Sequence, residues 1–362
     1  MYTKDKKFRL GIAGMGIGRS LGVPAINLVP QIQLVSVWGR SKDKVDELSA
    51  SLGIEGFTDF DAFVNSSDLD GVWLATPPSP RMDLMSKCLD AKLHVFLEKP
   101  LGINSSDIQN NLEKALANNS ICGVDFEYRA HPLYQEAKQL LETSWIGEPR
   151  SIHIRWMSGN RMDPAVPWGW YNSLHEGGGI VGAIATHHID LCHWLFGPIE
   201  SVQAMASTAI PERFDTLSSA VKACDSPETA LINLRFKNGA IGSISVSCVT
   251  FGGPPQAIEI NGDSGRIHLI SHNAQDAMRD FTLEALDVNG RQITSEAPFS
   301  AIDSEQRNGL ILPISILLKR WITSINNCSA MEPSLLDGLN VHNVVEAINA
   351  SLLSGERSAV NY

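Results

Sequence analysis

A charged pair ends one of the apolar segments of this chain. The run HVFLEKPLG has the side chains of a buried strand and then presents Glu98 and Lys99 against Pro100, which cannot continue strand pairing. A strand end is a rigid mount for a reactive group, and an ammonium there could polarise a carbonyl. The structural alternative is an exposed strand end with a surface salt bridge.

A second candidate group lies in GGGIVGAIATHHIDLCHW, where three glycines precede a helical pattern. His187 and Asp190 fall on one face of that helix. A histidine titrates near ~6.5 and a lysine near ~10.4, so the histidine is the better proton carrier at neutral pH. His188, Cys192 and His193 suggest a metal site instead, but no third-ligand pattern such as C-x-x-C accompanies them, and we expect no metal.

A glycine-rich turn, LGIAGMGIGRS, follows the first expected strand. In a dinucleotide fold, Gly14 would permit the turn and Gly16 would let backbone N–H groups approach a pyrophosphate. Gly18 is one residue early, because the G-x-G-x-x-G fingerprint needs glycine where Arg19 stands. A plain strand-to-loop turn is the alternative, and Pro24 predicts that the next helix starts late or is kinked.

The second expected strand ends in VSVWGRSKDK. An enzyme that prefers NAD usually has an acidic residue there to accept bonds from the ribose hydroxyls, but Gly39 occupies the position and Arg40 and Ser41 follow. An arginine can hold a 2′-phosphate through paired charge-assisted bonds, so the sequence favours NADP over NAD. A solvated helix start is the alternative interpretation.

The elements that would position these residues follow two patterns. Residues 8–125 alternate strands, at 9–13, 33–38, 71–75, 93–97 and 120–124, with helices at 42–52, 80–90 and 105–118. This alternation predicts an α/β domain with a parallel sheet, whose ligand lies at the carboxyl ends of the strands. After a helix near 132–142, strand-like runs and an Asn238-Gly239 hairpin signal predict an α+β half with an antiparallel sheet. The last sixty residues return to helix.

Polar and aromatic residues near the domain boundary are weaker candidates. Glu127 and Arg129, in FEYRAHP, follow the last strand of the first half and would border the cofactor and the substrate respectively, unless they form a structural ion pair. Trp168 and Trp170, in VPWGWYN, could stack on a sugar ring or pack under a loop.

The composition restricts the classes of partner. Lys plus Arg number 29 against 40 Asp plus Glu, a net charge of −11 without like-charge blocks, which argues against nucleic acid or a membrane surface. Six scattered cysteines without C-x-x-C are interpreted as reduced core residues. No export signal or membrane span is recognised, so a cytoplasmic protein with a small-molecule partner is expected.

Taken together, GIAGMGIGR, LATPPSP, VFLEKPLG, FEYRAHP and GGGIVGAIATHHIDLCHWLFGP resemble the Gfo/Idh/MocA family of NAD(P)-dependent oxidoreductases, over nearly the whole chain. The resemblance implies a Rossmann domain, taken as 1–126, and a C-terminal α+β domain with a large open, mainly antiparallel sheet, taken as 127–362. It also implies oligomerisation through that sheet, as a homodimer or homotetramer, and oxidation or reduction of a sugar, cyclitol or related compound.

The resemblance also assigns roles to residues. It implies that Lys99 lies beside the nicotinamide, that Glu98 lies near its ribose, and that the Lys99–Pro100 bond is cis. Thr76 and Pro77 match a position beside the cofactor. Lys99 would polarise the substrate carbonyl.

The histidine that matches His187 moves the proton in this family, often paired with an Asp four residues earlier. Here that position is Ala183, so Asp190, assigned to the substrate, or another residue must replace the missing carboxylate, or no pair forms. Two alternatives follow: a catalytically silent NAD(P)-binding regulator of the same fold, and a glycosidase-like enzyme that uses tightly held NAD.

Overall fold

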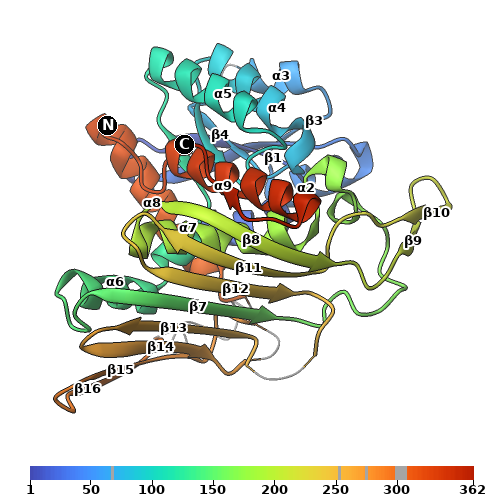
Figure 1. Ribbon diagram of the computed structural model, residues 1–362. Helices are drawn as coiled ribbons and strands as arrows, with labels where there is room; N and C mark the ends of the chain where they lie inside the picture. The colour runs from blue at the N-terminus through green and yellow to red at the C-terminus, as the bar shows by residue number, and fades with distance from the viewer. Residues whose placement is uncertain (67–68, 252–253, 274–275, 298–307) are drawn as a thin grey trace. The chain divides into compact units, whose positions relative to one another are not determined.

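The computed structural model describes residues 1–66, 69–251, 254–273, 276–297 and 308–362 (Figure 1). The chain divides into two compact units, one of residues 1–130 and 310–339 and the other of residues 131–309 and 340–362. The division falls within helix α9 (Leu335–Ser354). The segment Leu310–Leu339 also belongs to the first unit, so the chain returns to that unit late in the sequence. A single domain boundary near residue 126 does not describe this return.

Six parallel strands form the sheet of the first unit, in the order β3-β2-β1-β4-β5-β6. They are β1 (Phe8–Ala13), β2 (Ile32–Trp38), β3 (Glu55–Phe57), β4 (Gly71–Leu74), β5 (His94–Leu97) and β6 (Cys122–Val124). β4 and β5 are almost entirely buried, as expected for central parallel strands covered on both faces. This strand order is that of a doubly wound nucleotide-binding sheet, which confirms the predicted Rossmann fold. The three-residue β3 is too short and exposed to have been recognised from its pattern.

One helix of the first unit comes from the segment Leu310–Leu339. The helical segments are the π-helical turn η1 (Gly18–Gly22), α1 (Val23–Asn27), α2 (Lys42–Leu52), α3 (Phe60–Val64), α4 (Pro78–Asp90), α5 (Ser105–Asn118), the 3₁₀ turn η2 (Glu127–Ala130) and α8 (Ile311–Asn327). Trp321 of α8 is fully buried, with its ring 5.1 Å from that of Phe8. Its Nε1 donates to the carbonyl of Ile121 at 2.9 Å, so α8 is a core helix. Among the described residues, no helix combines the length and apolarity needed to cross a bilayer.

A nine-stranded sheet dominates the second unit, in the order β16-β15-β14-β13-β7-β12-β11-β8-β17 (Figure 1). Its strands are β7 (Pro149–Met157), β8 (Ile199–Ser207), β11 (Thr229–Phe236), β12 (Ile241–Ser247), β13 (Gln256–Gly262), β14 (Gly265–Ser271), β15 (Phe281–Asp287), β16 (Gln292–Glu296) and β17 (Ser358–Ala359). Of the described pairs, β7 with β12 alone is parallel. The mainly antiparallel sheet and the hairpin at Asn238-Gly239 are confirmed.

Shorter elements complete the second unit. They are α6 (Pro132–Glu142), η3 (Trp170–Asn172), η4 (Leu174–Glu176), the π-helical turn η5 (Val181–Ala185), α7 (Thr186–Phe196) and a separate hairpin of β9 (Glu212–Asp215) and β10 (Ala220–Ala223). The hairpin was not anticipated, because both strands are short and β10 lies mostly exposed.

Buried and exposed residues alternate along the strands, which gives the nine-stranded sheet one apolar face. A register row of buried side chains crosses seven strands through Ala204, Ile232, Ile244, Ile154, Ile258, Leu269 and Leu283. α6 contacts β15, α7 contacts β7 and η5 contacts β12. Met205 and Leu231 are cross-strand partners, and each is adjacent in sequence to a residue of this row. Both side chains are exposed, because successive residues of a strand point to opposite faces of the sheet.

The interpretation of every cysteine as a core residue is wrong at Cys328. Five thiols are buried, those of Cys88, Cys122, Cys192, Cys224 and Cys248. Cys328 is exposed, because it caps the C-terminus of α8 with φ of 49° instead of lying within an apolar element. Burial raises the pKa of Cys122 to about 12, which keeps that thiol protonated at neutral pH.

Candidate active site

The turn after β1 has the backbone geometry that a dinucleotide phosphate requires. Gly14 has φ of 123°, and a Cβ there would lie 2.4 Å from the carbonyl oxygen of Ala75. A Cβ on Gly16 would meet no atom within 4 Å, so this backbone faces open space. A Cβ on Gly18 would lie 2.6 Å from Cγ2 of Ile12, so Gly18 provides the close packing expected of the third glycine. The turn therefore fits the cofactor implied by the fold.

The helix after this turn begins irregularly, as Pro24 predicted. The π-helical turn η1 precedes α1, which carries Pro24 in its first turn. The backbone N–H of Arg19 donates to the carbonyl of Gly16 at 3.1 Å. The Arg19 guanidinium donates to the Glu47 carboxylate at 2.7 Å, in an exposed pair that a phosphate could displace at little cost.

The end of β2 lacks space for an acidic side chain. A Cβ on Gly39 would lie 2.5 Å from Cγ of Met15. Ser41 occupies the N-cap of α2 but makes no side-chain capping bond. Arg40 is exposed, and within the described part of the chain it forms no hydrogen bond or ion pair. Both side chains are therefore uncommitted.

A buried arginine clamps the turn that carries Lys99. Arg81 of α4 donates through Nη1 to the carbonyl of Glu98 at 2.6 Å and to the carbonyl of Pro100. Its Nη2 donates to the carbonyl of Thr76, so one guanidinium ties the loops after β4 and β5 together. Burial lowers the pKa of Arg81 to about 10, although Glu98 opposes the shift. The Lys99–Pro100 bond is cis, as the resemblance implied.

Thr76 presents an orphaned hydroxyl at the ligand edge of the sheet. Its Oγ1 is buried and has no hydrogen-bond partner among the described residues. Pro77 follows it and precedes α4, while Lys99 is half-buried after β5. Buried polar atoms are rarely left unsatisfied, so an unpaired hydroxyl here favours a polar ligand.

Three buried carboxyl groups surround this edge. Glu98 and Glu127 were predicted, whereas Asp125, which immediately follows β6, was not. Glu98 and Asp125 directly follow register partners on β5 and β6, so the two residues are neighbours at this edge. Burial, followed by the charges of Glu98 and Glu127, raises the pKa of Asp125 well above its usual range, against the opposing charge of Lys99.

Arg129 forms an ion pair inside the first unit. Its Nη2 lies 3.0 Å from Oδ1 of Asp337, and the backbone N–H of Ser334 donates to Oδ2 at 2.7 Å. Burial raises the pKa of Asp337, but the Arg129 charge and the Ser334 bonds outweigh it and the net shift is downward. This contact favours the structural alternative for Arg129, with Asp337 as a partner.

In the second unit, α7 positions His187 in its first turn, where the side chain is buried. Asp190, one turn further, is fully buried. Burial, with the Asp190 charge adding to it, raises the pKa of Cys192. Ala183 is buried in η5, the π-helical turn that leads into α7. π-Helical turns occur frequently at functional sites.

The histidines of the rival metal interpretation have partners in the protein. Nε2 of His188 lies 3.3 Å from Nε2 of Gln256, and Nε2 of His193 lies 2.9 Å from the Tyr362 hydroxyl. Across the ranges that the structure describes, no three His, Cys, Asp or Glu side chains gather as metal ligands.

The two candidate tryptophans differ in their surroundings. Nε1 of Trp168 donates to the carbonyl of Ala223 at 3.0 Å, and Nζ of Lys222 lies 4.4 Å from its ring centroid. Trp168 therefore packs against β10, which favours its structural alternative. Trp170 is half-buried, with its ring 6.1 Å from that of Tyr171, and it stays a candidate for the substrate.

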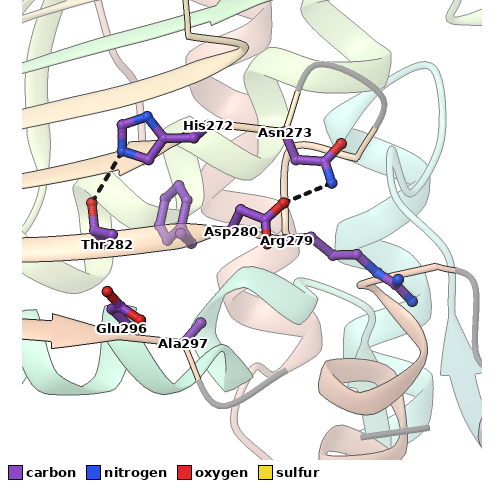
Figure 2. Close-up of a pocket in the computed structure, with 8 residues that line it drawn as sticks. His272, Asn273, Arg279, Asp280, Thr282, Glu296 and Ala297 are labelled. Carbon is purple, nitrogen blue, oxygen red and sulfur yellow. Dashed lines mark hydrogen bonds between the residues drawn. The ribbon is translucent and has the colours of Figure 1, made fainter. Parts of the chain in front are cut away.

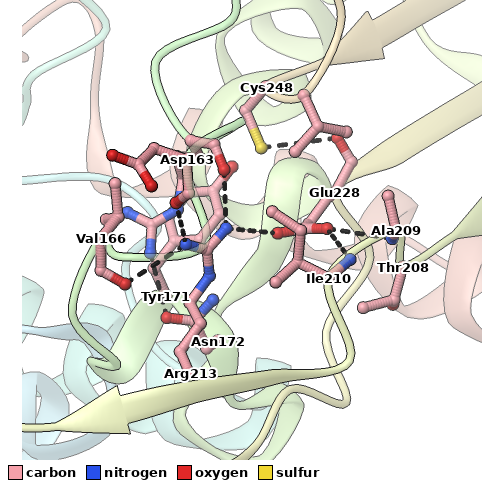
Figure 3. Close-up of polar contacts among 12 residues, drawn as sticks. Asp163, Val166, Tyr171, Asn172, Thr208, Ala209, Ile210, Arg213, Glu228 and Cys248 are labelled. Carbon is pink, nitrogen blue, oxygen red and sulfur yellow. Dashed lines mark hydrogen bonds and ion pairs between the residues drawn. The ribbon is translucent and has the colours of Figure 1, made fainter.

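A buried ion pair holds the loop that carries these tryptophans (Figure 3). Nη2 of Arg213 lies 3.0 Å from Oε1 of Glu228, and both side chains are almost fully buried. Arg213 also donates to the carbonyls of Arg161, Asp163 and Val166, at 2.6, 2.8 and 3.2 Å. One guanidinium thus fixes a stretch of backbone that has no regular secondary structure.

A polar cavity of about 350 Å³ lies in the second unit (Figure 2). Its walls are His272, Asn273, Arg279, Asp280, Phe281, Thr282, Glu296 and Ala297. Nδ2 of Asn273 donates to Asp280 at 3.0 Å, and the Thr282 hydroxyl lies 3.5 Å from Nε2 of His272. None of the residues predicted from the sequence lines this cavity.

Two site residues were missed at the sequence level. Asp125 had an available signal, because it follows its strand directly, as Glu98 does on the neighbouring strand. Arg81 had none, since a cation in a helical pattern normally predicts a solvated position.

The two halves of the chain match two family models. Residues 8–126 match the oxidoreductase family with an NAD-binding Rossmann fold, and residues 134–268 match the GFO/IDH/MocA C-terminal domain. These two domains define a class of two-domain, nicotinamide-dependent oxidoreductases. The chain belongs to the Gfo/Idh/MocA family, and it is a dehydrogenase or reductase acting on CH–OH groups.

Curated relatives are similar over most of the chain. An uncharacterised oxidoreductase of Synechocystis is 29% identical over 93% of this chain and 92% of its own. Myo-inositol 2-dehydrogenase of Thermotoga maritima is 28% identical over 78% of this chain and 79% of its own. A levoglucosan dehydrogenase solved with NADH and L-sorbose has a TM-score of 0.87 at 22% identity, covering 98% of this chain and 99% of that one, which shows a shared fold.

Proposed function

We propose that this protein transfers a hydride between NADP and a hydroxyl or carbonyl carbon of a sugar or cyclitol. The observation that carries the proposal is the carboxyl edge of the Rossmann sheet, where the open Gly16 backbone and the clamped Lys99 turn lie after β1 and β5. The names of similar proteins support the substrate class, since one acts on myo-inositol and another was solved with L-sorbose.

Each proposed catalytic residue has a separate role. The nicotinamide, when bound, supplies or accepts the hydride. The half-buried Lys99 polarises the substrate carbonyl and stabilises developing alkoxide charge. His187, on α7, donates or accepts the proton. Gly14, Gly16 and Gly18 hold the pyrophosphate through their backbone, and Arg40 with Ser41 holds the 2′-phosphate.

The alternatives make different predictions in one assay. Hydride exchange is measured with NADPH and NADH across keto sugars and inosose-like ketones. Cofactor binding without turnover on the whole panel would favour a silent regulator. A nucleotide that co-purifies and is unchanged after turnover would favour the glycosidase-like enzyme. Retention of both Lys99 and His187 supports the dehydrogenase over the regulator.

Lys99→Met is expected to lower kcat by roughly 10²–10³, because it removes a preorganised cation from the developing alkoxide. Cofactor affinity should change little, as the turn is held through backbone carbonyls. Lys44→Met, which removes an exposed lysine from α2 of the same unit, is the matched control. Turnover by Lys99→Met at the wild-type rate would contradict the assigned role.

Arg40→Ala is expected to weaken NADP binding about tenfold or more, with NAD binding unchanged, because a charge-assisted bond to the 2′-phosphate is lost. Lys42→Ala is the control, since Nζ of Lys42 is paired with Asp46 at 2.6 Å. Dissociation constants measured for both nucleotides provide the test. A wild-type protein that binds NAD more tightly than NADP would overturn the cofactor preference.

We also expect a homodimer or homotetramer that uses the open face of the nine-stranded sheet. The exposed pair Met205 and Leu231 supports this, because apolar cross-strand neighbours on an open face favour burial against another surface. Light scattering of the wild type and of Leu231→Glu tests it, with a monomeric wild type as the contradicting result.

A further inference from the structure

Two carboxyl groups meet at the ligand edge of the Rossmann sheet. Leu97 and Val124 are register partners at the ends of β5 and β6, and Glu98 and Asp125 are the next residues of each strand. The backbone N–H of Asp125 donates to the carbonyl of Leu97 at 2.8 Å, so the parallel pairing continues as far as this residue. Glu98 is 4% exposed and Asp125 is 1% exposed.

The position of these two carboxyl groups favours a proton on Asp125. Burial and the charge of the adjacent Glu98 both raise the pKa of Asp125. A protonated Asp125 could donate to Glu98, whereas two ionised carboxylates are acceptors only. The charged groups that act on Asp125 are Glu98, Glu127 and Lys99, and the first two oppose its ionisation. The buried guanidinium of Arg81, on α4, interacts with the charge of Glu98.

A second observation links the pair to a ligand. Oε1 of Glu98 and Oδ1 of Asp125 are buried without hydrogen-bond partners among the described residues, as is the hydroxyl of Thr76 after the adjacent strand β4. These three oxygens lie after neighbouring strands at the edge where a doubly wound sheet binds its ligand. A ligand rich in hydroxyl donors would satisfy them.

We propose that Glu98 and Asp125 share one proton at neutral pH, and that Asp125 is a positioning residue whose O–H holds the Glu98 carboxylate for a ribose hydroxyl of the cofactor. This deepens the proposed function and rests on it for the identity of the ligand. With the proton shared, the pair carries one negative charge beside Lys99. Without it, two adjacent buried carboxylates repel each other and Glu98 is displaced.

Infrared spectroscopy of the protein without cofactor tests the shared proton directly. Wild type at pH 7 is expected to show a protonated carboxyl band that shifts in ²H₂O, and Asp125→Asn should lose one such band per chain. Asp215→Asn is the matched control, since bonds from Lys222, Ser218 and the N–H of Leu217 hold the pKa of that buried Asp215 carboxylate low. No change between wild type and Asp125→Asn would overturn the proposal, whether or not the enzyme turns over.

The pH dependence of stability gives an independent readout. The folded protein keeps the Asp125 proton at pH values where the unfolded chain has lost it, so the stability of wild type falls as pH rises from the ordinary carboxyl range towards the raised pKa of Asp125. An asparagine donates the same kind of bond without titrating. The melting temperature of Asp125→Asn relative to wild type should therefore increase as pH increases, and a constant difference would contradict the shared proton.

The positioning role is tested by comparing two variants at position 125. Asp125→Leu removes the donor and should weaken cofactor binding about tenfold or more relative to Asp125→Asn, which keeps it. Equal dissociation constants for the two variants would overturn the positioning role. Absence of nucleotide binding in wild type, with the infrared band intact, would instead contradict the proposed function.

Discussion

Replacing His187 with alanine is expected to lower kcat by roughly 10²–10⁴, the usual contribution of a positioned proton carrier. The side chain is 3% exposed and lies in the first turn of α7, a helix fixed against the sheet by its contact with β7. Added imidazole should restore part of the rate, because it can occupy the volume left by the side chain and carry the proton. Steady-state kinetics with and without imidazole measure both effects.

The neighbouring histidine provides the control. His188 is also buried in α7, and its Nε2 is engaged by Gln256, so His188→Ala removes an equivalent imidazole that has no proposed chemical role. Its loss should affect stability more than kcat, and imidazole should not change its rate. Equal losses of kcat in the two variants, or no rescue of His187→Ala, would contradict the proton-carrier role.

Arg213→Met is expected to lower the free energy of unfolding of the second unit by about 3–5 kcal/mol, because it leaves Glu228 as an unpaired buried charge. The side chains of Arg213 and Glu228 are 0% and 1% exposed, so water cannot replace the lost partner. Three backbone carbonyls also lose their donor. Denaturant titration monitored by tryptophan fluorescence measures the change.

Two comparisons make this prediction specific. The double variant Arg213→Met with Glu228→Gln should be more stable than Arg213→Met alone, since the amide oxygen can still accept from Ala209 and Ile210 without a buried charge. Arg150→Met breaks an exposed pair with Asp263 and should cost less than about 1 kcal/mol. A loss of similar size in Arg150→Met would show that burial does not decide the effect.

Local pattern was sufficient for most of the fold. The alternation of apolar strands and amphipathic helices predicted the parallel sheet, and Asn238-Gly239 predicted the hairpin between β11 and β12. The segment Leu310–Leu339 was placed in the second half, because helical periodicity does not specify which sheet a helix packs against. The ring contacts of Trp321 with Phe8 and Phe96 depend on side chains more than 200 residues away in the sequence.

Some features of the candidate site were predicted and others were not, because local pattern does not specify contacts with residues distant in sequence. The glycine turn was predicted from adjacent residues, the cis Lys99–Pro100 bond was implied by the family resemblance, and both are seen. Arg129 and Trp168 were candidates for ligand contact, each with a structural alternative, and their partners Asp337 and Ala223 favour those alternatives. Those partners are distant in sequence, so no local pattern could reveal them.

The sequence by itself determined the class of fold and the family and supplied the candidate reactive side chains, because these depend on short-range spacing, periodicity and motif. Only the tertiary structure decided which of those side chains are committed to the protein and which remain open to a ligand. Burial and neighbouring charge are set by residues that the tertiary structure brings together, as parallel strand register brings Glu98 and Asp125 together. This adjacency of two buried acids is the basis for the proton that we propose they share.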